Sequence, residues 1–357
     1  MTENFAKISA AVGGSDADAV LITSAENRFY AAGFRSTAGE LVITGDSAAL
    51  FIDSRYFEEA SERIRGAEVF LSRRGAEYYA QIDEYLKAHG VKKLGAEEKK
   101  LSFDRWNAYA QNLSAELVPG QAVLEKLRAV KSREELAVMV KAQRIAEKAF
   151  NELLPQITRD ATEKELAGEL VCRMIKNGAE DRSFDPIVVS GTHSSVPHGG
   201  PRDVKIQPGF LTIDFGALYG GYCSDTTRTL CVGEPTAEME KVYRVVLDAQ
   251  AAARAAARPG ISGAALDGVA RRVIADAGYG EYFTHSLSHG VGIEIHEAPF
   301  CGQTSKDIVP AGAVLSDEPG IYIPGRFGVR IEDVLCITED GCEDITELPR
   351  ELSVVCG

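Results

Sequence analysis

Short apolar runs and helical patterns alternate along the first third of the chain. Apolar runs bounded by turn residues predict strands, and the turn Gly45-Asp46-Ser47 joins two of them into a hairpin. The strands are expected at 19–22, 40–44, 48–52, 69–71 and 93–95, and the helices at 56–64 and 77–89. This order predicts a small α/β domain in which helices pack on a mixed sheet.

Two helices followed by strands occur twice in the rest of the chain, which suggests a duplicated α+β unit. Capping boxes, Ser132 with Glu135 and Thr162 with Glu165, mark the starts of the first two helices. The helices are expected at 132–153, 162–177, 237–258 and 263–277, and the strand-rich segments at 183–229 and 283–357. We expect the domain boundary after residue 125, with an N-terminal domain at 1–125 and a second domain at 126–357.

Composition fits two ordinary globular domains and excludes several classes of protein. The chain has 357 residues, 45% hydrophobic and 26% charged, with a formal net charge of −14. This acidity argues against a nucleic-acid partner, because phosphate binding needs a basic surface. The start of the chain lacks a signal-peptide core, and no stretch reaches the roughly 20 apolar residues of a membrane helix. Seven cysteines without a CxxC pair argue against disulfides and structural zinc, so we expect a cytoplasmic protein with no membrane partner.

Carboxylates lie inside apolar strand segments of the second domain. Asp214 and Asp225 lie on either side of a glycine-rich reversal, and a lone buried charge there would be costly. Glu318 and Glu332 lie on the two arms of a second predicted hairpin. Four carboxylates cannot share a core without cations, so the pattern favours divalent metal ions. For Asp214 alone, a buried salt bridge, for example with Arg228, is an equal alternative.

Five of the six histidines fall in the same part of the chain as these carboxylates. They are His193, His198, His285, His289 and His296. Gly290 and Gly292 indicate irregular backbone after His289, so an imidazole ligand on an open loop fits better than an HExxH zinc helix. An oxygen-rich site with one or two imidazoles suits two hard or borderline divalent ions. A structural role remains the alternative for any single histidine.

Taken together, the motifs resemble those of the pita-bread metallopeptidases, and among them the proline-specific branch of Xaa-Pro dipeptidase (prolidase) and aminopeptidase P. The similarity lies in DFG…GYCSDTTRT, HGVG…HEAP, EPGIY and GVRIED, and it extends to the creatinase-like segments 27–34 and 51–56. One departure is Ser288, where the family often has glycine. The resemblance implies an α+β protein with a C-terminal pita-bread (creatinase/aminopeptidase) fold after a smaller α/β creatinase-like domain.

The resemblance also implies a dinuclear metal centre. Asp214 would chelate one ion, and His289 with Glu318 the other. Asp225 and Glu332 would bridge the two ions. The ions would be Mn²⁺ first, with Co²⁺ or Zn²⁺ as alternatives. A hydroxide shared by the two ions would attack the carbonyl before proline.

Further roles follow from the same resemblance. Glu318 would shuttle a proton, His296 would stabilise the oxyanion, and His198 would contact the proline nitrogen or the substrate carboxylate. His198, His285, His296 and Arg330 would bind substrate, and Arg330 with Thr227 would support the metal carboxylates. The substrates would be proline-containing dipeptides or oligopeptides, and the enzyme would be a homodimer.

Two other functions stay open on the sequence alone. A creatinase-like amidinohydrolase shares both domains, although that enzyme lacks the metal ligands that this chain retains. A non-catalytic peptide-binding module is the second alternative, and such a protein would be expected to lose ligands. The length of peptide accepted is not decided by the motifs.

Overall fold

The structure is a computed structural model that describes residues 3–356 and divides into two compact units. The first unit ends at Arg128, and the second begins at Ala129. The predicted boundary after residue 125 falls inside helix α6 (Gln121–Ala129). The Pro119-Gly120 turn signal ends a strand of the first unit, and α6 follows it before the unit ends.

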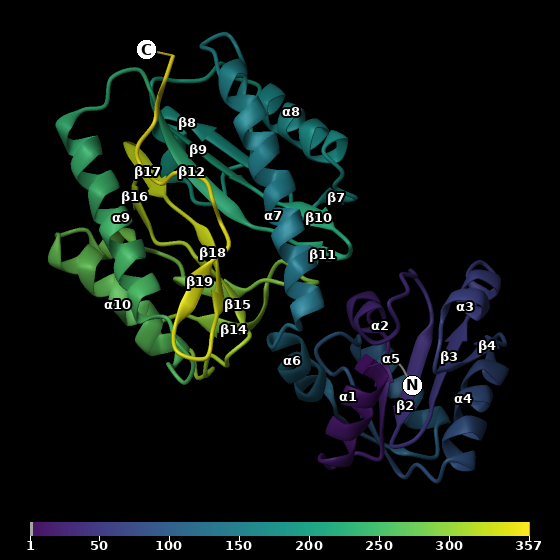
Figure 1. The fold of residues 1–357 in the computed structure, drawn as a ribbon. Helices are drawn as coiled ribbons and strands as arrows, with labels where there is room; N and C mark the ends of the chain where they lie inside the picture. Colours follow the sequence, from purple (N-terminus) through teal and green to yellow (C-terminus); the bar gives the residue numbers. More distant parts are fainter. Residues whose placement is uncertain (1–2, 357) are drawn as a thin grey trace. The chain divides into compact units, whose positions relative to one another are not determined.

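The first unit is a six-stranded mixed sheet with the order β4-β3-β2-β1-β5-β6 (Figure 1). Its strands are β1 (Ala19–Ile22), β2 (Glu40–Thr44), β3 (Ala48–Ile52), β4 (Glu68–Leu71), β5 (Lys93–Ala96) and β6 (Glu116–Pro119). Its other helices are α1 (Glu3–Gly13), α2 (Ala25–Ala32), α3 (Phe57–Arg63), α4 (Ala76–Ala88) and α5 (Phe103–Asn112). Leu21, Val42 and Phe51 face a cluster with α4 and α5, while α1 contacts the sheet through β1 and β2. The predicted hairpin is therefore present as β2 and β3.

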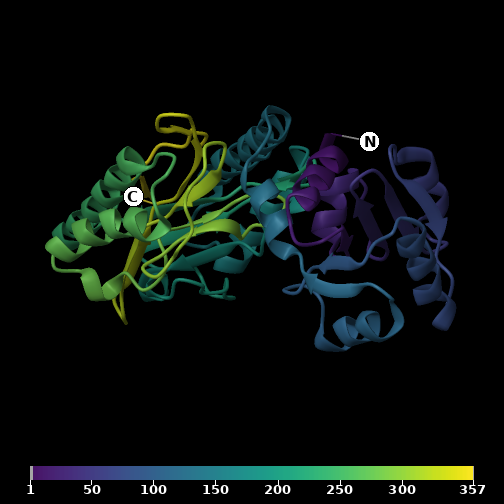
Figure 2. The same ribbon diagram turned by 90° about the horizontal axis from the view of Figure 1, so that it is seen from below.

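The second unit repeats the expected order of two helices followed by strands. Its helices are α7 (Arg133–Leu153), α8 (Glu163–Lys176), α9 (Ala237–Ala256) and α10 (Gly263–Asp276). Both capping boxes form. The side chains of Ser132 and Thr162 each accept a hydrogen bond from the backbone N–H of the third helical residue, a glutamate, and their own backbone N–H groups donate to its carboxylate. The helices α9 and α10, in green, pack side by side (Figures 1 and 2).

Two sheets and a hairpin carry the strands that matter for the site. The first sheet has the order β20-β12-β9-β8, with β8 (Ile187–Ser190), β9 (Gly209–Phe215), β12 (Thr226–Val232) and β20 (Val354–Val355). The second has the order β14-β13-β15-β18-β19, with β13 (Ser288–Gly290), β14 (Glu297–Cys301), β15 (Val314–Asp317), β18 (Asp333–Ile337) and β19 (Cys342–Asp344). The hairpin is β16 (Gly320–Ile323) with β17 (Phe327–Arg330). A small third sheet contains β7 (Asp181–Arg182), β10 (Ala217–Tyr219) and β11 (Tyr222–Cys223).

Strand alternation separates the core from the polar face of β9. Ile213 and Phe215 join the cluster formed with α7 and α8, and the ring of Phe215 stacks on that of Phe150 at 5.1 Å between centroids. Successive side chains of a strand point to opposite faces, so Asp214 points away from these helices. The apolar neighbours of Asp214 thus fix the direction in which its carboxylate points.

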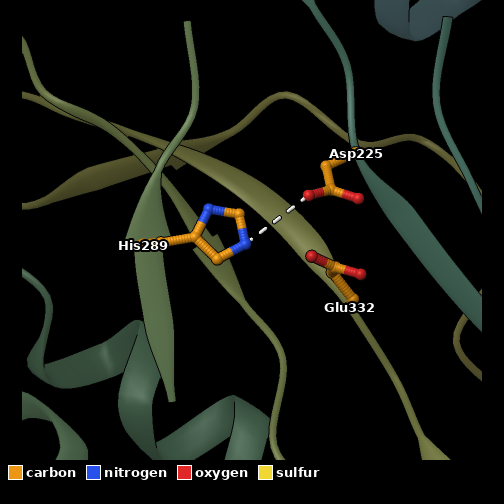
Figure 3. Close-up of side chains that lie close together, drawn as sticks. All are labelled: Asp225, His289 and Glu332. Atoms are coloured by element: carbon orange, nitrogen blue, oxygen red, sulfur yellow. Dashed lines mark ion pairs between the residues drawn. The ribbon is translucent and has the colours of Figure 1, made fainter. Parts of the chain in front are cut away.

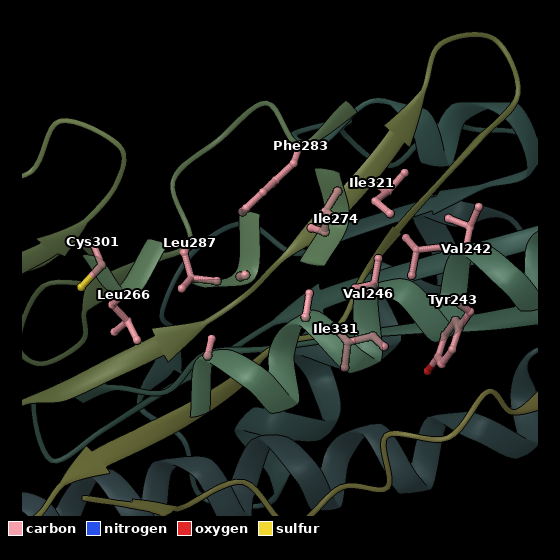
Figure 4. Packing of buried hydrophobic residues seen from close by; sticks show 14 of the residues in the cluster. Val242, Tyr243, Val246, Leu266, Ile274, Phe283, Leu287, Cys301, Ile321 and Ile331 are labelled. Carbon is pink, nitrogen blue, oxygen red and sulfur yellow. The ribbon is translucent and has the colours of Figure 1, made fainter. Parts of the chain in front are cut away.

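A second cluster lies between α9, α10 and the β16–β17 hairpin (Figure 4). It includes Val242 and Val246 of α9, Ile274 of α10, Ile321 of β16, and Ile331 directly after β17. Burial of Ile331 in this cluster anchors the chain just before Glu332. Within the described residues, no helix is both long and apolar enough to cross a membrane.

Candidate metal centre

Five side chains that lie in strands or next to strand ends meet in one cavity of about 490 Å³. Asp214 lies in β9, Asp225 directly before β12, and His289 in β13. Glu318 lies between β15 and β16, and Glu332 lies between β17 and β18. The two glutamates therefore sit just beyond the ends of the hairpin strands rather than on them. All five predicted metal ligands line the cavity.

The tightest group is formed by Asp225, His289 and Glu332 (Figure 3). One possible ligand atom from each lies within 4.8 Å of the others. His289 Nε2 is 3.7 Å from Asp225 Oδ2 and 3.2 Å from Glu318 Oε1. A nitrogen with carboxylate oxygens at these separations is the donor set of a divalent metal site that contains one imidazole.

His289 is held by its own strand. The prediction of an open loop was wrong, because residue 289 lies in the short strand β13, whose pairing with β14 is irregular between Ser288 and Gly290. Its Nδ1–H donates to the carbonyl of Gly290 at 3.2 Å, and its backbone N–H donates to Ser316 Oγ at 3.0 Å. With Nδ1 as the donor, Nε2 is the ring atom that faces the carboxylates, and once it loses its proton it can offer a lone pair to a metal ion.

Arg330 and Thr227 link the carboxylates on the other side of the cavity. Arg330 Nη2 donates to Asp214 Oδ2 at 2.6 Å, and Arg330 Nε donates to Thr227 Oγ1 at 3.0 Å. Thr227 Oγ1 in turn donates to Glu332 Oε2 at 2.7 Å. The suggested pairing of Asp214 with Arg228 was therefore wrong.

Arg228 has a different partner because β12 alternates like β9. Thr227 points toward Arg330 and Glu332, so the neighbouring Arg228 points to the other face, where it pairs with Asp333 at 2.7 Å. Sequence spacing alone could not separate these two arginines, since the partner of Asp214 is 116 residues away.

Even with these bonds, the carboxylates are incompletely satisfied. Asp214 Oδ1 and Glu332 Oε1 are buried and have no hydrogen-bond partner among the described residues. Burial raises the pKa of Asp225 and of Glu332 well above the ordinary values, and repulsion from neighbouring carboxylates adds to this. Burial also raises the pKa of Asp214, although Arg330 opposes the shift. Orphan oxygens and mutual repulsion are what a bound divalent cation would relieve, so the side chains fit such an ion.

His289 and Glu318 form an ion pair inside this cluster. Burial lowers the pKa of His289, but the hydrogen bond to Glu318 and the charges of Glu318 and Asp225 outweigh burial and raise it. Burial raises the pKa of Glu318, and the contact with His289 outweighs that effect and lowers it. In the metal-free site, protonated His289 therefore supplies the positive charge that pairs with Glu318.

Four further predicted residues line the same cavity: His198, His285, His296 and Arg330. The ring of His296 lies 4.4 Å from that of His289, centroid to centroid. Burial lowers the pKa of both His285 and His296, so both are neutral at pH 7. His193, which belongs to the same sequence cluster, is absent from the residues that line this cavity.

Tyr322 is a residue of this site whose role the sequence did not reveal. Its hydroxyl accepts a hydrogen bond from Arg330 Nη1 at 2.8 Å and lies 2.9 Å from His285 Nε2. Because His285 Nδ1 lies 2.8 Å from the carbonyl of Ser286 and donates to it, Tyr322 donates to Nε2. The motif EPGIY contains this tyrosine, but nothing in the motif shows where the hydroxyl points.

Charged pairs outside the cavity hold the segments that carry the histidines. Arg271 of α10 pairs with Asp267 at 2.7 Å and donates to the carbonyls of Phe283 and His285. Lys131 pairs with Glu297, the neighbour of His296, at 2.9 Å, and both side chains are buried. These contacts join residues that are far apart in sequence, so no local pattern predicts them.

Comparison with known proteins agrees with this geometry. Residues 137–339 match the model of metallopeptidase family M24, and residues 5–130 match that of the creatinase/prolidase N-terminal domain. The chain belongs to metallopeptidase family M24. The M24 domain contains all five predicted metal ligands, and the expected fold, a pita-bread domain after a creatinase-like α/β domain, is confirmed.

Relatives of this M24 peptidase align along almost its full length. An uncharacterized peptidase of Bacillus subtilis is 43% identical, over 95% of this chain and 96% of the relative. The structure of an Xaa-Pro dipeptidase from Bacillus anthracis superposes with a TM-score of 0.94 at 39% identity, covering 99% of each chain. That of an X-Pro aminopeptidase from Thermotoga maritima gives 0.89 at 35% identity, covering 97% of this chain and 100% of the other.

Proposed function

We propose that this M24 peptidase is a divalent-metal-dependent exopeptidase that hydrolyses the Xaa-Pro bond of dipeptides or of peptide N-termini. The observation that carries the proposal is the convergence of four carboxylates and one imidazole in one buried cavity, with two carboxylate oxygens left without partners. The names of related proteins, an Xaa-Pro dipeptidase and an X-Pro aminopeptidase, support the choice of bond.

The ligand assignment is part of the proposal. Asp214 would hold one ion, His289 and Glu318 the other, and Asp225 and Glu332 would be shared. Mostly oxygen donors suit Mn²⁺, and the single imidazole is compatible with Co²⁺ or Zn²⁺. Bound ions supply Lewis-acid activation of water and of the peptide carbonyl.

The chain's own residues would handle protons and orientation. Glu318 has one oxygen 3.3 Å from Ser316 Oγ, and its carboxylate can take a proton from the attacking water and return it to the leaving nitrogen. His296 would donate to the carbonyl oxygen as negative charge develops there. His198 would contact the proline nitrogen, and His285 would complete the pocket wall beside Tyr322.

Proline explains why a dedicated enzyme is needed. Its nitrogen carries no proton once it is in a peptide bond, so a peptidase that recognises that N–H cannot use it. The cavity offers apolar side chains next to the metal ligands, including Ile187, Pro197 and Ile295, against which a pyrrolidine ring can pack. A homodimer and a cytoplasmic location belong to the same proposal, and light scattering tests the first of these.

A small panel of substrates tests the function. Purified protein loaded with Mn²⁺ is incubated with Ala-Pro and Ala-Pro-Ala, with Ala-Ala and Ala-Ala-Ala as matched peptides without proline, and with creatine. We expect release of alanine only from proline peptides. Hydrolysis of creatine would favour an amidinohydrolase, and metal binding with no turnover of any substrate would favour a peptide-binding module.

A further inference from the structure

We infer that the substrate of this cavity is a peptide of three or more residues, and that free Xaa-Pro dipeptides are poor substrates. The inference rests on the proposed function and concerns which Xaa-Pro peptides the site takes. It is drawn from the charged side chains of the second unit that line the cavity.

Negative groups dominate the lining. Besides the four carboxylates of the metal centre, Asp185 also lines the cavity. Arg330 is the one arginine among the lining residues, and no lysine is among them. Two divalent ions would be balanced by the four carboxylates, and the one further positive charge in the lining, that of Arg330, is bound to Asp214 and Thr227.

Arg330 is already committed to the protein. Its side chain is 3% exposed, and Nε donates to Thr227 while Nη2 donates to Asp214. Nη1 donates to the carbonyl of Pro197 at 3.2 Å and to the hydroxyl of Tyr322 at 2.8 Å. Turning this guanidinium toward a substrate carboxylate would break the bonds that support the metal ligands.

The imidazoles do not replace a permanent cation. His285 already uses both ring nitrogens, on the carbonyl of Ser286 and the hydroxyl of Tyr322. The ring of His296 packs against that of the proposed ligand His289, with 4.4 Å between centroids. His198 also lines the cavity and can donate a hydrogen bond to a carboxylate, but an imidazole does not replace the permanent charge of an arginine or a lysine.

The outer part of the cavity is apolar or acidic. Phe184 and Phe300 line it, and Phe300 is 46% exposed. The carboxylate of Asp185 is paired with Arg182 at 2.7 Å. This surface suits the uncharged backbone and side chains of residues after proline, and the pairing of Asp185 with Arg182 leaves it, among its described residues, without a free cation for an anion.

A dipeptide brings an anion to this surface, and a longer peptide does not. In Xaa-Pro the free carboxylate is bonded to the α-carbon that carries the scissile nitrogen, so it must enter the cavity with the proline ring. Burial of a charge without a partner is strongly unfavourable. In a longer peptide the same carbonyl belongs to a neutral amide, and the terminal carboxylate stays in water.

Matched substrates that differ only in this charge test the inference. We expect kcat/KM of the Mn²⁺-loaded enzyme for Ala-Pro-amide and Ala-Pro-Ala to exceed that for Ala-Pro by about tenfold or more, since burying a charge without a partner is strongly unfavourable. Calorimetric binding to the metal-loaded Glu318→Gln variant, in which turnover is blocked, should show the same order. Equal or faster cleavage of Ala-Pro would overturn the inference and leave the Xaa-Pro activity standing. If none of the three peptides were cleaved, the proposed function itself would fail.

A charge change at the mouth gives an independent test. The Asp185 side chain is 88% exposed, so Asp185→Lys and its neutral control Asp185→Asn should both fold. We expect Asp185→Lys to reduce the preference for Ala-Pro-amide over Ala-Pro by severalfold at low salt, and Asp185→Asn to reduce it less. An unchanged ratio in Asp185→Lys would show that charge does not set the length preference, which would overturn the inference.

Discussion

At the scale of single residues, the proposed metal ligands lower the stability of the metal-free fold while they supply the charge that would bind metal. Glu332 is 1% exposed, one of its oxygens has no partner, and three other acidic side chains lie nearby. Such a group destabilises the metal-free fold, because desolvation and like charge both oppose its ionisation. The presence of Glu332 is therefore explained by metal binding and not by a contribution to the stability of the fold.

Replacing Glu332 with glutamine should separate these two effects. The amide can still accept from Thr227 Oγ1 but removes the buried charge. We expect kcat/KM to fall by more than about 100-fold, since even residues that only support metal ligands cost 10- to 100-fold. The melting temperature of the metal-free protein should stay equal or rise.

Glu343→Gln, at an exposed position, is the matched control for Glu332→Gln. It should change neither kcat/KM nor the melting temperature of the metal-free protein. Metal content by mass spectrometry and thermal unfolding after chelation are the measurements. A metal-free Glu332→Gln protein that melts well below the metal-free wild type would contradict the view that this charge is a strain on the fold.

Protons should leave the site when metal binds. The pKa values of Asp214, Asp225, Glu332 and His289 are all raised, so these groups hold protons above their ordinary titration range. A metal ion must displace those protons, and fewer remain as pH rises. We expect Mn²⁺ affinity to increase from pH 6 to pH 8, with proton release seen by calorimetry in buffers of different ionisation enthalpy. Proton uptake on binding, or an Mn²⁺ affinity that falls as pH rises, would show that the pKa values of these groups are not raised.

At the scale of elements, each metal or substrate residue lies where an apolar strand places it. Ile213 and Phe215 fix Asp214, and Ile331 fixes Glu332, by packing on opposite helix pairs. The sequence predicted these strands well, because apolar alternation and capping boxes are local signals. It could not predict that Arg330 rather than Arg228 pairs with Asp214, since that depends on how two sheets face each other.

The buried pair of Lys131 and Glu297 should matter for both stability and the His296 segment. Lys131→Met removes the buried cation that faces the carboxylate of Glu297, which should cost about 3–5 kcal/mol of unfolding free energy. The double variant Lys131→Met/Glu297→Gln should recover part of that loss, because no buried charge remains. KM should rise in the single variant, as His296 adjoins Glu297 and lines the cavity.

Denaturant unfolding of the two single variants and the double variant measures the coupling between Lys131 and Glu297. Lys148→Met is the control, because its pair with Glu152 is exposed and 3.9 Å apart, and it should change stability by about 1 kcal/mol or less. Strictly additive losses from Lys131 and Glu297 would mean that the pair does not act as a unit.

At the scale of the whole molecule, the cores do not depend on the site. Two apolar clusters of the second unit pack against the helix pairs, and the cavity lies on the polar side of the strands. Removing metal with a chelator should therefore abolish activity while the circular dichroism spectrum remains that of a folded protein. Adding Mn²⁺ at about 100 times its Kd should restore activity and stabilise the fold by about 2.7 kcal/mol. Unfolding on chelation alone would contradict this separation of core and site.

The sequence predicted five of the six strands of the first unit, the four α-helices of the second unit, and the five residues that line one cavity. In the first unit it missed the strand β6 and the helices α1, α2, α5 and α6. The boundary predicted after residue 125 lies in α6, close to Arg128, where the first compact unit ends. The open loop expected around His289 proved to be a strand. Gly290 and Gly292 are typical of loops, and the strand that pairs with this segment cannot be identified from the sequence. The errors at His289 and at the partner of Asp214 both concern long-range packing, which local patterns do not encode.

Anomalous diffraction from crystals grown with Mn²⁺ tests the central claim most directly. We predict anomalous peaks at the manganese edge among the five side chains, with oxygen and nitrogen ligands at roughly 2.0–2.6 Å. The ligands expected at these peaks are Asp214, Asp225, His289, Glu318 and Glu332. No peak in this cavity, or manganese bound only elsewhere in a crystal of active enzyme, would contradict the account.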